Sequence, residues 1–314
     1  MYAGTATATA SVATAAVLGA GMLLMSNPGA PLPDAPATLR TVQQAGPVRH
    51  ATDAMARGPR VYAHRGASAY APENTLVAVD RADALGFDWV ENDVQLTRDG
   101  VPVVMHDTGL KRTTNAEEVF PDRAPWAVKD FTAAEISRLD AGSWFGARYA
   151  GTRVPTLRQF LRRLGHNRQN LLLEIKSPGT YPGIERVTLK VLNEEGWLDR
   201  AHVRDRLVIQ SFGAGSVRTV HALRPDVVTG FLGAPAVAKL PAYAEFTDQI
   251  NPPSAGLSGG YVAAVHALKG PHGKKLQVSP WTVNDAASAR KVDGMGVDGI
   301  ITNAPDVVRA ATKG

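Results

Sequence analysis

The sequence predicts an α/β fold, namely a (β/α)8 TIM barrel that carries a small insertion at its mouth. Short apolar runs alternate with amphipathic segments from about residue 60 onward, and this alternation is typical of parallel strands joined by helical crossovers. Eight such runs in about 255 residues match the size of a closed barrel. An open doubly wound sheet is the alternative, and the sequence shows no internal repeat and no second domain.

The hydrophobic pattern places the individual elements. We expect strands at 61–64, 89–94, 171–175, 207–212, 227–232, 255–259, 276–283 and 299–302. We expect helices at 76–85, 184–195, 216–223, 261–268 and 286–295. The run AGLSG at 255–259 is the weakest of the predicted strands.

Residues 108–155 interrupt this rhythm and are rich in proline and glycine. They contain one helical segment near 132–139, where Thr132 and Glu135 have the spacing of a capping box. We interpret 108–155 as an insertion at the active-site mouth, because excursions there commonly shape access to the site.

The first 59 residues differ in composition from the rest of the chain. Residues 1–37 hold an apolar segment, no lysine or arginine, and an A-x-A sequence at 35–37, and these features predict an export signal. The basic segment that usually opens such a signal is missing. An uncleaved membrane anchor is the alternative, because about 20 apolar residues span a bilayer. We therefore expect an exported protein, secreted or at the cell surface, with a linker at 38–59 and the barrel at 60–314.

Charge and cysteine content exclude several classes of site. The chain of 314 residues has 34 Lys and Arg against 29 Asp and Glu, and this modest excess identifies no partner by itself. No dense basic run with interleaved aromatic residues is present, so nucleic acid is not a predicted partner. The absence of cysteine excludes a disulfide framework, a thiolate metal site and a cysteine nucleophile.

The sequence around 98–101 predicts a β-hairpin that leaves the barrel. The dipeptide Asp99-Gly100 favours a two-residue loop between strand-like runs, because glycine tolerates the positive φ that such a loop needs. A connection this short joins antiparallel strands. Counting outward from a two-residue loop, we expect Asp93 to face His106.

Three acidic residues sit in otherwise apolar strands. Glu91 and Asp93 are two positions apart and share one face of their strand. Two carboxylates side by side on a buried face repel each other, and a divalent cation between them removes that cost. Glu174 ends another predicted strand, followed by Lys176 on the same face. Because active sites lie where the carboxyl ends of barrel strands converge, we expect these residues to meet. Ligation by oxygen alone favours Mg²⁺ or Ca²⁺ over Zn²⁺.

Two histidines are predicted near the same rim. His64 and Arg65 end the first strand, and His106 follows the hairpin. Histidine transfers protons near neutral pH, and arginine suits bidentate recognition of phosphate. A single histidine at a strand end is usually structural, but this combination of residue types predicts an active site for an anionic substrate.

The combined motifs resemble the glycerophosphodiester phosphodiesterases, within the phospholipase-C-like TIM-barrel phosphodiesterases. The likeness extends from about residue 61 to 307. The matching residues are His64-Arg65-Gly66, Ala71-Pro72-Glu73-Asn74-Thr75, Glu91-x-Asp93-Val94, Thr97-x-Asp99-Gly100, Val101-Pro102-Val103-Val104, His106-Asp107, Arg112-Thr113-Thr114-Asn115, Pro155-Thr156-Leu157, Leu173-Glu174-Ile175-Lys176, Gln210-Ser211-Phe212 and Trp281-Thr282-Val283-Asn284.

The resemblance implies a metal-dependent hydrolase of small anionic phosphodiesters, which yields glycerol 3-phosphate and an alcohol. One divalent cation, Mg²⁺ or Ca²⁺, would lie on Glu91, Asp93 and Glu174. His64 and His106 would form the general acid–base pair. The sequence does not define which histidine is the acid, whether water or the substrate's glycerol hydroxyl attacks, which head group is preferred, or the oligomeric state.

The resemblance also implies the substrate-binding residues. Arg65 and Lys176 would contact the phosphate, Trp281 would line the pocket, and Glu73 would support the site from behind. Barrel packing is an equal alternative for Trp281. One departure from the family is Asn303, where an aspartate is more common. We expect this change to affect the alcohol preference and to leave the catalytic set intact.

Two other functions are alternatives. One is a phospholipase-D-like enzyme on the same barrel that acts on lysophospholipids or sphingomyelin. Secreted toxins of that type usually carry disulfides, and this chain has no cysteine. The other is a non-catalytic barrel that binds glycerophosphodiesters, against which the complete set of histidines and acids argues.

Overall fold

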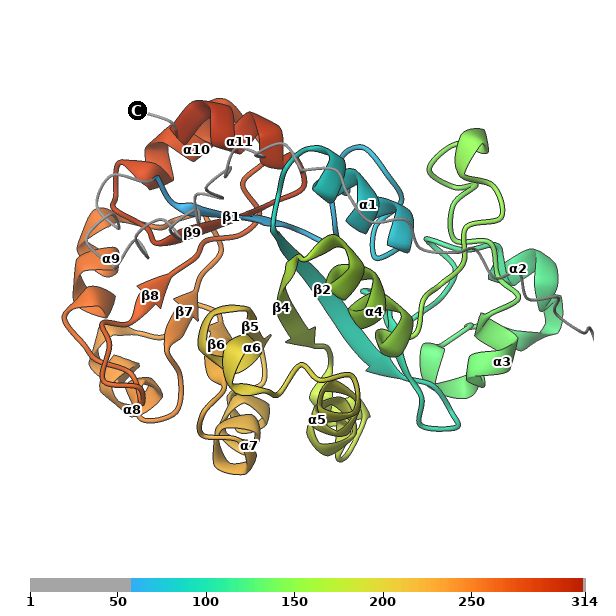
Figure 1. The fold of residues 1–314 in the computed structure, drawn as a ribbon, viewed down its shortest axis with the longest axis horizontal. Coiled ribbons are helices and arrows are strands. Elements are labelled where there is room, and N and C mark those ends of the chain that lie inside the picture. Colours follow the sequence, from blue (N-terminus) through green and yellow to red (C-terminus); the bar gives the residue numbers. More distant parts are fainter. Residues whose placement is uncertain (1–57, 313–314) are drawn as a thin grey trace, which may run out of the picture. The chain divides into compact units, whose positions relative to one another are not determined.

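The computed structural model describes residues 58–312, in which helices surround a barrel of parallel strands (Figure 1). Its strands are β1 (Arg60–Ala63), β2 (Trp89–Leu96), β4 (Asn170–Ile175), β5 (Leu207–Ser211), β6 (Val228–Leu232), β7 (Gln249–Asn251), β8 (Gln277–Val278) and β9 (Gly299–Thr302). They follow the order β8-β7-β6-β5-β4-β2-β1-β9, and all of these neighbours are parallel. The backbone N–H groups of Asp298 and Ile301 donate to the carbonyls of Val278 and Pro280, over 2.9 and 3.0 Å, and nearly close the barrel. The predicted TIM barrel is confirmed.

The helices occupy the crossovers between these strands and the insertion. They are α1 (Leu76–Ala84), α2 (Ala116–Val119), α3 (Ala133–Ile136), α4 (Leu157–Asn167), α5 (Ile184–Glu194), α6 (Arg200–Asp205), α7 (Ala214–Leu223), α8 (Leu240–Ala244), α9 (Gly259–His266), α10 (Ala286–Asp293) and α11 (Pro305–Thr312). Fully buried residues of the strands, such as Val90 and Leu171, pack with Val79 of α1 and Phe160 of α4 in the main core. Burial between strands and helices therefore accounts for the apolar strand pattern.

The sixth parallel strand is not where the sequence predicted it. Residues 255–259 form a turn and the start of α9, and the strand is instead β7. Its Gln249 and Asn251 are fully buried but polar. The Asn251 amide donates to Gln210 Oε1 over 2.9 Å, and the Gln249 amide donates to Gln277 Oε1 over 3.0 Å. Because hydrogen bonds across the barrel interior satisfy these side chains, a search for apolar runs misses the strand.

The predicted hairpin is present, but its register is shifted by one residue. Strand β3 (Pro102–Val104) runs antiparallel to β2, with Val94 opposite Val104. The loop has three residues, because Thr97 N donates to Val101 O over 3.1 Å and Gly100 adopts a φ of 75°. The prediction that Asp93 faces His106 is therefore wrong, since Met105 N donates to the Asp93 carbonyl over 2.9 Å.

The insertion has a hydrophobic core of its own. Leu110, Phe131, Ile136 and Leu139 are buried together in it. The predicted capping box is confirmed, because Thr132 caps α3 and the Glu135 side chain accepts from the Thr132 backbone over 2.7 Å. In Figure 1, α2 and α3 lie beside the β2–β3 hairpin and outside the ring of barrel helices.

The predicted export signal and most of the linker fall outside the described residues. Among residues 58–312, no helix has both the length and the apolar character needed to cross a lipid bilayer.

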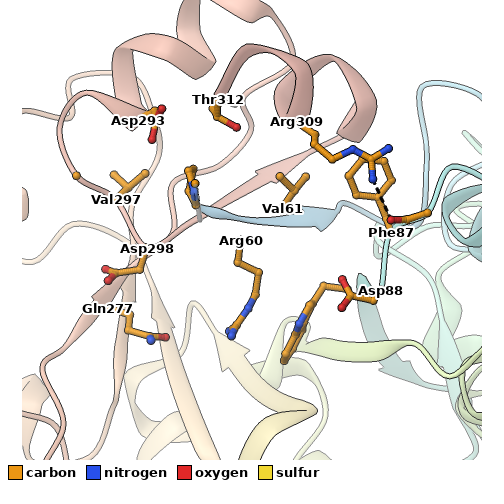
Figure 2. A pocket seen from close by; sticks show the side chains of 15 residues that line it. Arg60, Val61, Phe87, Asp88, Gln277, Asp293, Val297, Asp298, Arg309 and Thr312 are labelled. Carbon is orange, nitrogen blue, oxygen red and sulfur yellow. Dashed lines mark hydrogen bonds between the residues drawn. The ribbon is translucent and has the colours of Figure 1, made fainter. Parts of the chain in front are cut away.

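A cavity of about 710 Å³ lies where the barrel strands begin (Figure 2). Arg60 opens β1 and Gln277 opens β8, and both line this cavity together with Asp88, Asp298 and Arg309. Active sites of such barrels form at the opposite, carboxyl ends of the strands. The chemistry is therefore to be sought at the other end, where a smaller cavity lies.

Candidate active site

Three buried carboxylates form the base of the site. Asp93 of β2 and Glu174 of β4 are direct neighbours across the ladder, and Glu91 lies two residues before Asp93 on the same face. One oxygen from each of the three lies within 4.8 Å of the others. All three residues are at most 5% exposed. The structure thus brings together the three acids that the sequence placed at one rim.

Two cationic side chains and one amide hold the central carboxylate. Arg65 Nε lies 3.3 Å from Asp93 Oδ2, and Lys176 Nζ lies 3.6 Å from Asp93 Oδ1. The amide of Asn74, which is itself buried, donates to Asp93 Oδ2 over 2.8 Å. Burial opposes ionisation of Asp93, but the charges of Arg65 and Lys176 outweigh it and hold its pKa below the usual range.

The negative charges of Glu91 and Glu174 are less well balanced by nearby cations than that of Asp93. Burial, followed by the charges of Asp93 and Glu174, raises the pKa of Glu91 well above its usual value. Burial and the charge of Asp93 raise the pKa of Glu174 to about 8. The protein's own cations therefore do not balance three ionised acids at neutral pH.

This acidic cluster fits a divalent cation. Asp93 Oδ1 and Glu174 Oε1 are buried and accept no well-formed hydrogen bond, although Lys176 Nζ lies 2.9 Å from Glu174 Oε1. Buried polar atoms without partners are rare, and such an atom needs an explanation. Oxygen ligands from carboxylates are the donors that hard cations such as Mg²⁺ and Ca²⁺ prefer.

His64 lies above this cluster at the end of β1. Its Nδ1 contacts Asn303 Oδ1 at 2.6 Å, and its Nε2 lies 3.9 Å from Glu91 Oε2. Because the amide oxygen only accepts, Nδ1 carries the proton and the lone pair lies on Nε2. Burial and the neighbouring charge of Arg65 lower the pKa of His64 to about 4. The imidazole is therefore neutral near pH 7.

His106 has a different partner. Its Nδ1 contacts the carboxylate of Asp107 at 2.7 Å. The carboxylate beside His106 carries a full negative charge, whereas the amide oxygen beside His64 is neutral. The two histidines therefore share one site but differ in the charge of the group that contacts Nδ1.

A cavity of about 90 Å³ brings these groups together where the barrel strands end. Its lining includes both histidines, two of the acids, the two cationic side chains and an aromatic wall. Phe212 and Trp281 form that wall, with their ring centroids 5.4 Å apart and their planes at 79°. The Trp281 indole donates to the Asn251 carbonyl over 2.8 Å, so Trp281 both lines the cavity and packs on the barrel. One side of the cavity is therefore charged and the other apolar.

Glu73 lies behind the cavity and binds two arginines. It accepts from Arg65 Nη1 over 2.8 Å and from Arg112 over 2.8 and 2.9 Å. Burial alone would raise the pKa of Glu73, but the bonds from Arg112 and Arg65 bring it below the usual value. Arg65 is thus held between two carboxylates, Glu73 and Asp93.

All nine residues that the sequence singled out line this cavity or lie directly behind it. For five further residues of the site, the sequence analysis did not identify the contacts that they make. Asn74, Asp107, Arg112 and Phe212 lie within the quoted motifs, but those motifs give no sign of what the side chains contact. Asn303 was expected on the substrate side, but it contacts His64 instead. Its contact partner lies 239 positions away in the sequence, so no local pattern reveals it.

The geometry suits a phosphate ester, because cationic side chains, two histidines and acids able to hold a cation line one small cavity. Together with the barrel, this site places the chain among the TIM-barrel phosphodiesterases.

The chain belongs to the glycerophosphoryl diester phosphodiesterase family, whose family model matches residues 64–307. It is 37% identical over 265 residues to a glycerophosphodiester phosphodiesterase of Bacillus subtilis (strain 168), covering 80% of this chain and 86% of that protein. It is 36% identical over 250 residues to a glycerophosphodiester phosphodiesterase of Caldanaerobacter subterraneus subsp. tengcongensis, covering 79% of this chain and 95% of that protein. These relatives are phosphoric diester hydrolases by name.

A solved structure shares the fold. The phosphodiesterase of Oleispira antarctica, in complex with the product sn-glycerol-3-phosphate, matches with a TM-score of 0.69 and 29% identity, covering 83% of this chain and 99% of that chain.

Proposed function

We propose that this protein hydrolyses glycerophosphodiesters to glycerol 3-phosphate and an alcohol, with the help of one divalent cation. The observation that carries the proposal is the placement of two histidines, with different partners, on one cavity that opens over three buried carboxylates. The named relatives support the substrate class, because the Oleispira antarctica protein holds sn-glycerol-3-phosphate.

Glu91, Asp93 and Glu174 are the residues that would hold the cation, Mg²⁺ or Ca²⁺. When bound, a divalent ion supplies positive charge that polarises a phosphoryl oxygen. Arg65 and Lys176 line the cavity and bring further positive charge to the phosphate. Arg65 and Lys176 orient the diester relative to the two histidines and stabilise the negative charge that develops on the phosphoryl oxygens during the reaction.

The partners of the histidines suggest their roles. His64 holds its Nδ1 proton against Asn303 and keeps a free lone pair on Nε2, so it accepts the proton of the attacking hydroxyl. This hydroxyl belongs either to water or to the substrate's own glycerol. His106, whose Nδ1 contacts the Asp107 carboxylate, delivers a proton to the departing alkoxide.

Release of glycerol 3-phosphate from glycerophosphocholine tests the function. The purified protein should release it with Mg²⁺ or Ca²⁺, and EDTA should stop the release. His64→Ala and His106→Ala should each lose most of the activity while keeping the wild-type circular dichroism spectrum. Cleavage of lysophosphatidylcholine in place of glycerophosphocholine would favour the phospholipase-D-like alternative, and binding without product release would favour a non-catalytic barrel.

We also propose export of the protein, on the basis of the apolar segment and the A-x-A sequence within residues 1–37. Fractionation of cells that express the full chain tests this, and recovery of the protein only in the cytosol would contradict it.

A further inference from the structure

Arg112 occupies a central position in a network of charged side chains behind the cavity. It lies in the loop between β3 and α2, at the start of the insertion. Its guanidinium donates to the Asp107 carboxylate over 2.5 and 2.9 Å and to the Glu73 carboxylate over 2.9 and 2.8 Å. The Arg112 side chain therefore binds two carboxylates, each through two hydrogen bonds. This bidentate geometry is the strongest that arginine offers.

Each carboxylate leads on to a group at the cavity. Asp107 contacts Nδ1 of His106 at 2.7 Å, and Glu73 accepts from Arg65 over 2.8 Å. Arg112 lines no part of the cavity itself, so it acts through these neighbours. The network thus joins the loop that carries His106 to the loop that follows β1.

The exposure of His106 and Asp107 shows why the hydrogen bonds from Arg112 are needed. The side chains of His106 and Asp107 are 28% and 30% exposed, so packing alone does not fix the imidazole. The hydrogen bonds from Arg112 hold the pKa of Asp107 at about 2, so it remains a carboxylate throughout the neutral range. Asp107 therefore always accepts the Nδ1 proton of His106 and leaves Nε2 free for the cavity.

Stability alone is a poor explanation for this network. Arg112 is 44% exposed, and exposed ion pairs contribute about 0–1 kcal/mol. A proton donor, by contrast, works only within hydrogen-bond reach and in the right direction, so small misplacements are costly to the rate.

We infer that Arg112 is a positioning residue for His106: by clamping Asp107 to Glu73 it aims the imidazole at the departing alcohol. This inference rests on the proposed function and on His106 as the proton donor. It predicts that Arg112 matters most where the leaving alcohol needs a proton.

Two substrates separate this role from a structural one. Glycerophosphocholine releases choline, a poor leaving group that requires protonation. The corresponding 4-nitrophenyl diester of glycerol phosphate releases 4-nitrophenolate, which leaves without a proton. Arg112→Gln should lower kcat on glycerophosphocholine about 10- to 100-fold. This is the usual effect of losing a hydrogen-bond partner that orients a functional side chain from behind. KM should change less, and kcat on the 4-nitrophenyl diester should stay within about threefold, because Glu73 keeps its hydrogen bond to Arg65 and nitrophenolate leaves without a proton.

Matched variants complete the test. Arg186→Gln removes an exposed arginine of α5 and should leave kcat on both substrates unchanged. Arg112→Lys keeps the charge but cannot grip both carboxylates in bidentate fashion, so its kcat on glycerophosphocholine should fall between wild type and Arg112→Gln. In a His106→Ala background, Arg112→Gln should add no further loss.

Equal losses on both substrates, or a further loss in the His106→Ala background, would overturn the inference, as would wild-type kcat for Arg112→Gln on glycerophosphocholine. The proposed function is judged separately, from product release by the wild-type protein. Should Arg112→Gln unfold, Asp107→Asn provides the same comparison, since it weakens the same acceptor.

Discussion

The two histidines of the site differ in the atom that receives their Nδ1 proton. For His64 this atom is the amide oxygen of Asn303, and for His106 it is a carboxylate oxygen of Asp107. The sequence identified both histidines but not this difference. Asp107 follows His106 directly, whereas Asn303 comes from the far end of the chain. The departure from the family pattern at Asn303 therefore lies beside His64, one of the two histidines that we propose as the acid–base pair.

Replacing Asn303 by aspartate should shift the pH dependence of the reaction. A carboxylate beside Nδ1 stabilises the imidazolium, so the pKa of His64 should rise from its lowered value of about 4 by about 1 to 2 units. A base with a higher pKa is protonated at higher pH, so the acidic limb of the kcat/KM profile should move to higher pH. An acidic limb that stays in place in Asn303→Asp would show that His64 is not the base.

At the scale of elements, the sequence predicted strands where buried residues are apolar and failed where they are polar. The predicted helices correspond to α1, α3, α5, α7, α9 and α10, and seven of the predicted strands are present. Residues 249–251 are largely polar, and the hydrophobic pattern predicted a strand at 255–259 instead. Strand β2 shows the same effect, since Gln95 is fully buried, donates to the carbonyls of Met105 and Asp107 over 2.7 Å each, and accepts from the Tyr181 hydroxyl over 2.9 Å. Whether a polar segment forms a buried strand depends on hydrogen-bond partners from elsewhere in the chain, and a single sequence does not reveal these partners.

The hairpin turn provides a test at this scale. Gly100 has a φ of 75°, and a Cβ there would meet nothing within 4 Å. Gly100→Ala should therefore cost only the backbone strain of the left-handed region, about 1–2 kcal/mol, in urea unfolding. Gly165, exposed in α4, has a helical backbone and equal space around it. Gly165→Ala should stabilise the protein by about 0.5–1 kcal/mol, and the same sign for both variants would contradict the account.

At the scale of the whole molecule, the fold was predictable because strand number, helix alternation and length agree with one architecture. The site was predictable because a barrel brings its strand ends together. The barrel thus buries two acids, Glu91 and Glu174, whose negative charges its own cations do not fully balance. Stability and function are therefore linked through the charge state of Glu91 and Glu174.

This linkage predicts how the metal-free protein responds to pH. The pKa of Glu174 is raised from 4.5 to about 8, so the unfolded chain loses this proton first. Ionisation then favours unfolding as pH rises from about 4.5 to about 8. In EDTA, the melting temperature of the wild type should fall across this window relative to that of Glu174→Gln, where the group does not titrate. Added Mg²⁺ or Ca²⁺ should raise the wild-type melting temperature most at the upper end. Parallel pH curves for the two proteins would contradict the raised pKa.

The most direct test of the site as a whole compares the two histidine variants on the two leaving groups. His106→Ala should lose about 10²- to 10⁴-fold on glycerophosphocholine and far less on the 4-nitrophenyl diester, because nitrophenolate leaves without a proton. His64→Ala should lose activity on both, since both need the attacking hydroxyl to be deprotonated. Equal losses for the two variants on both substrates would contradict a divided acid–base pair.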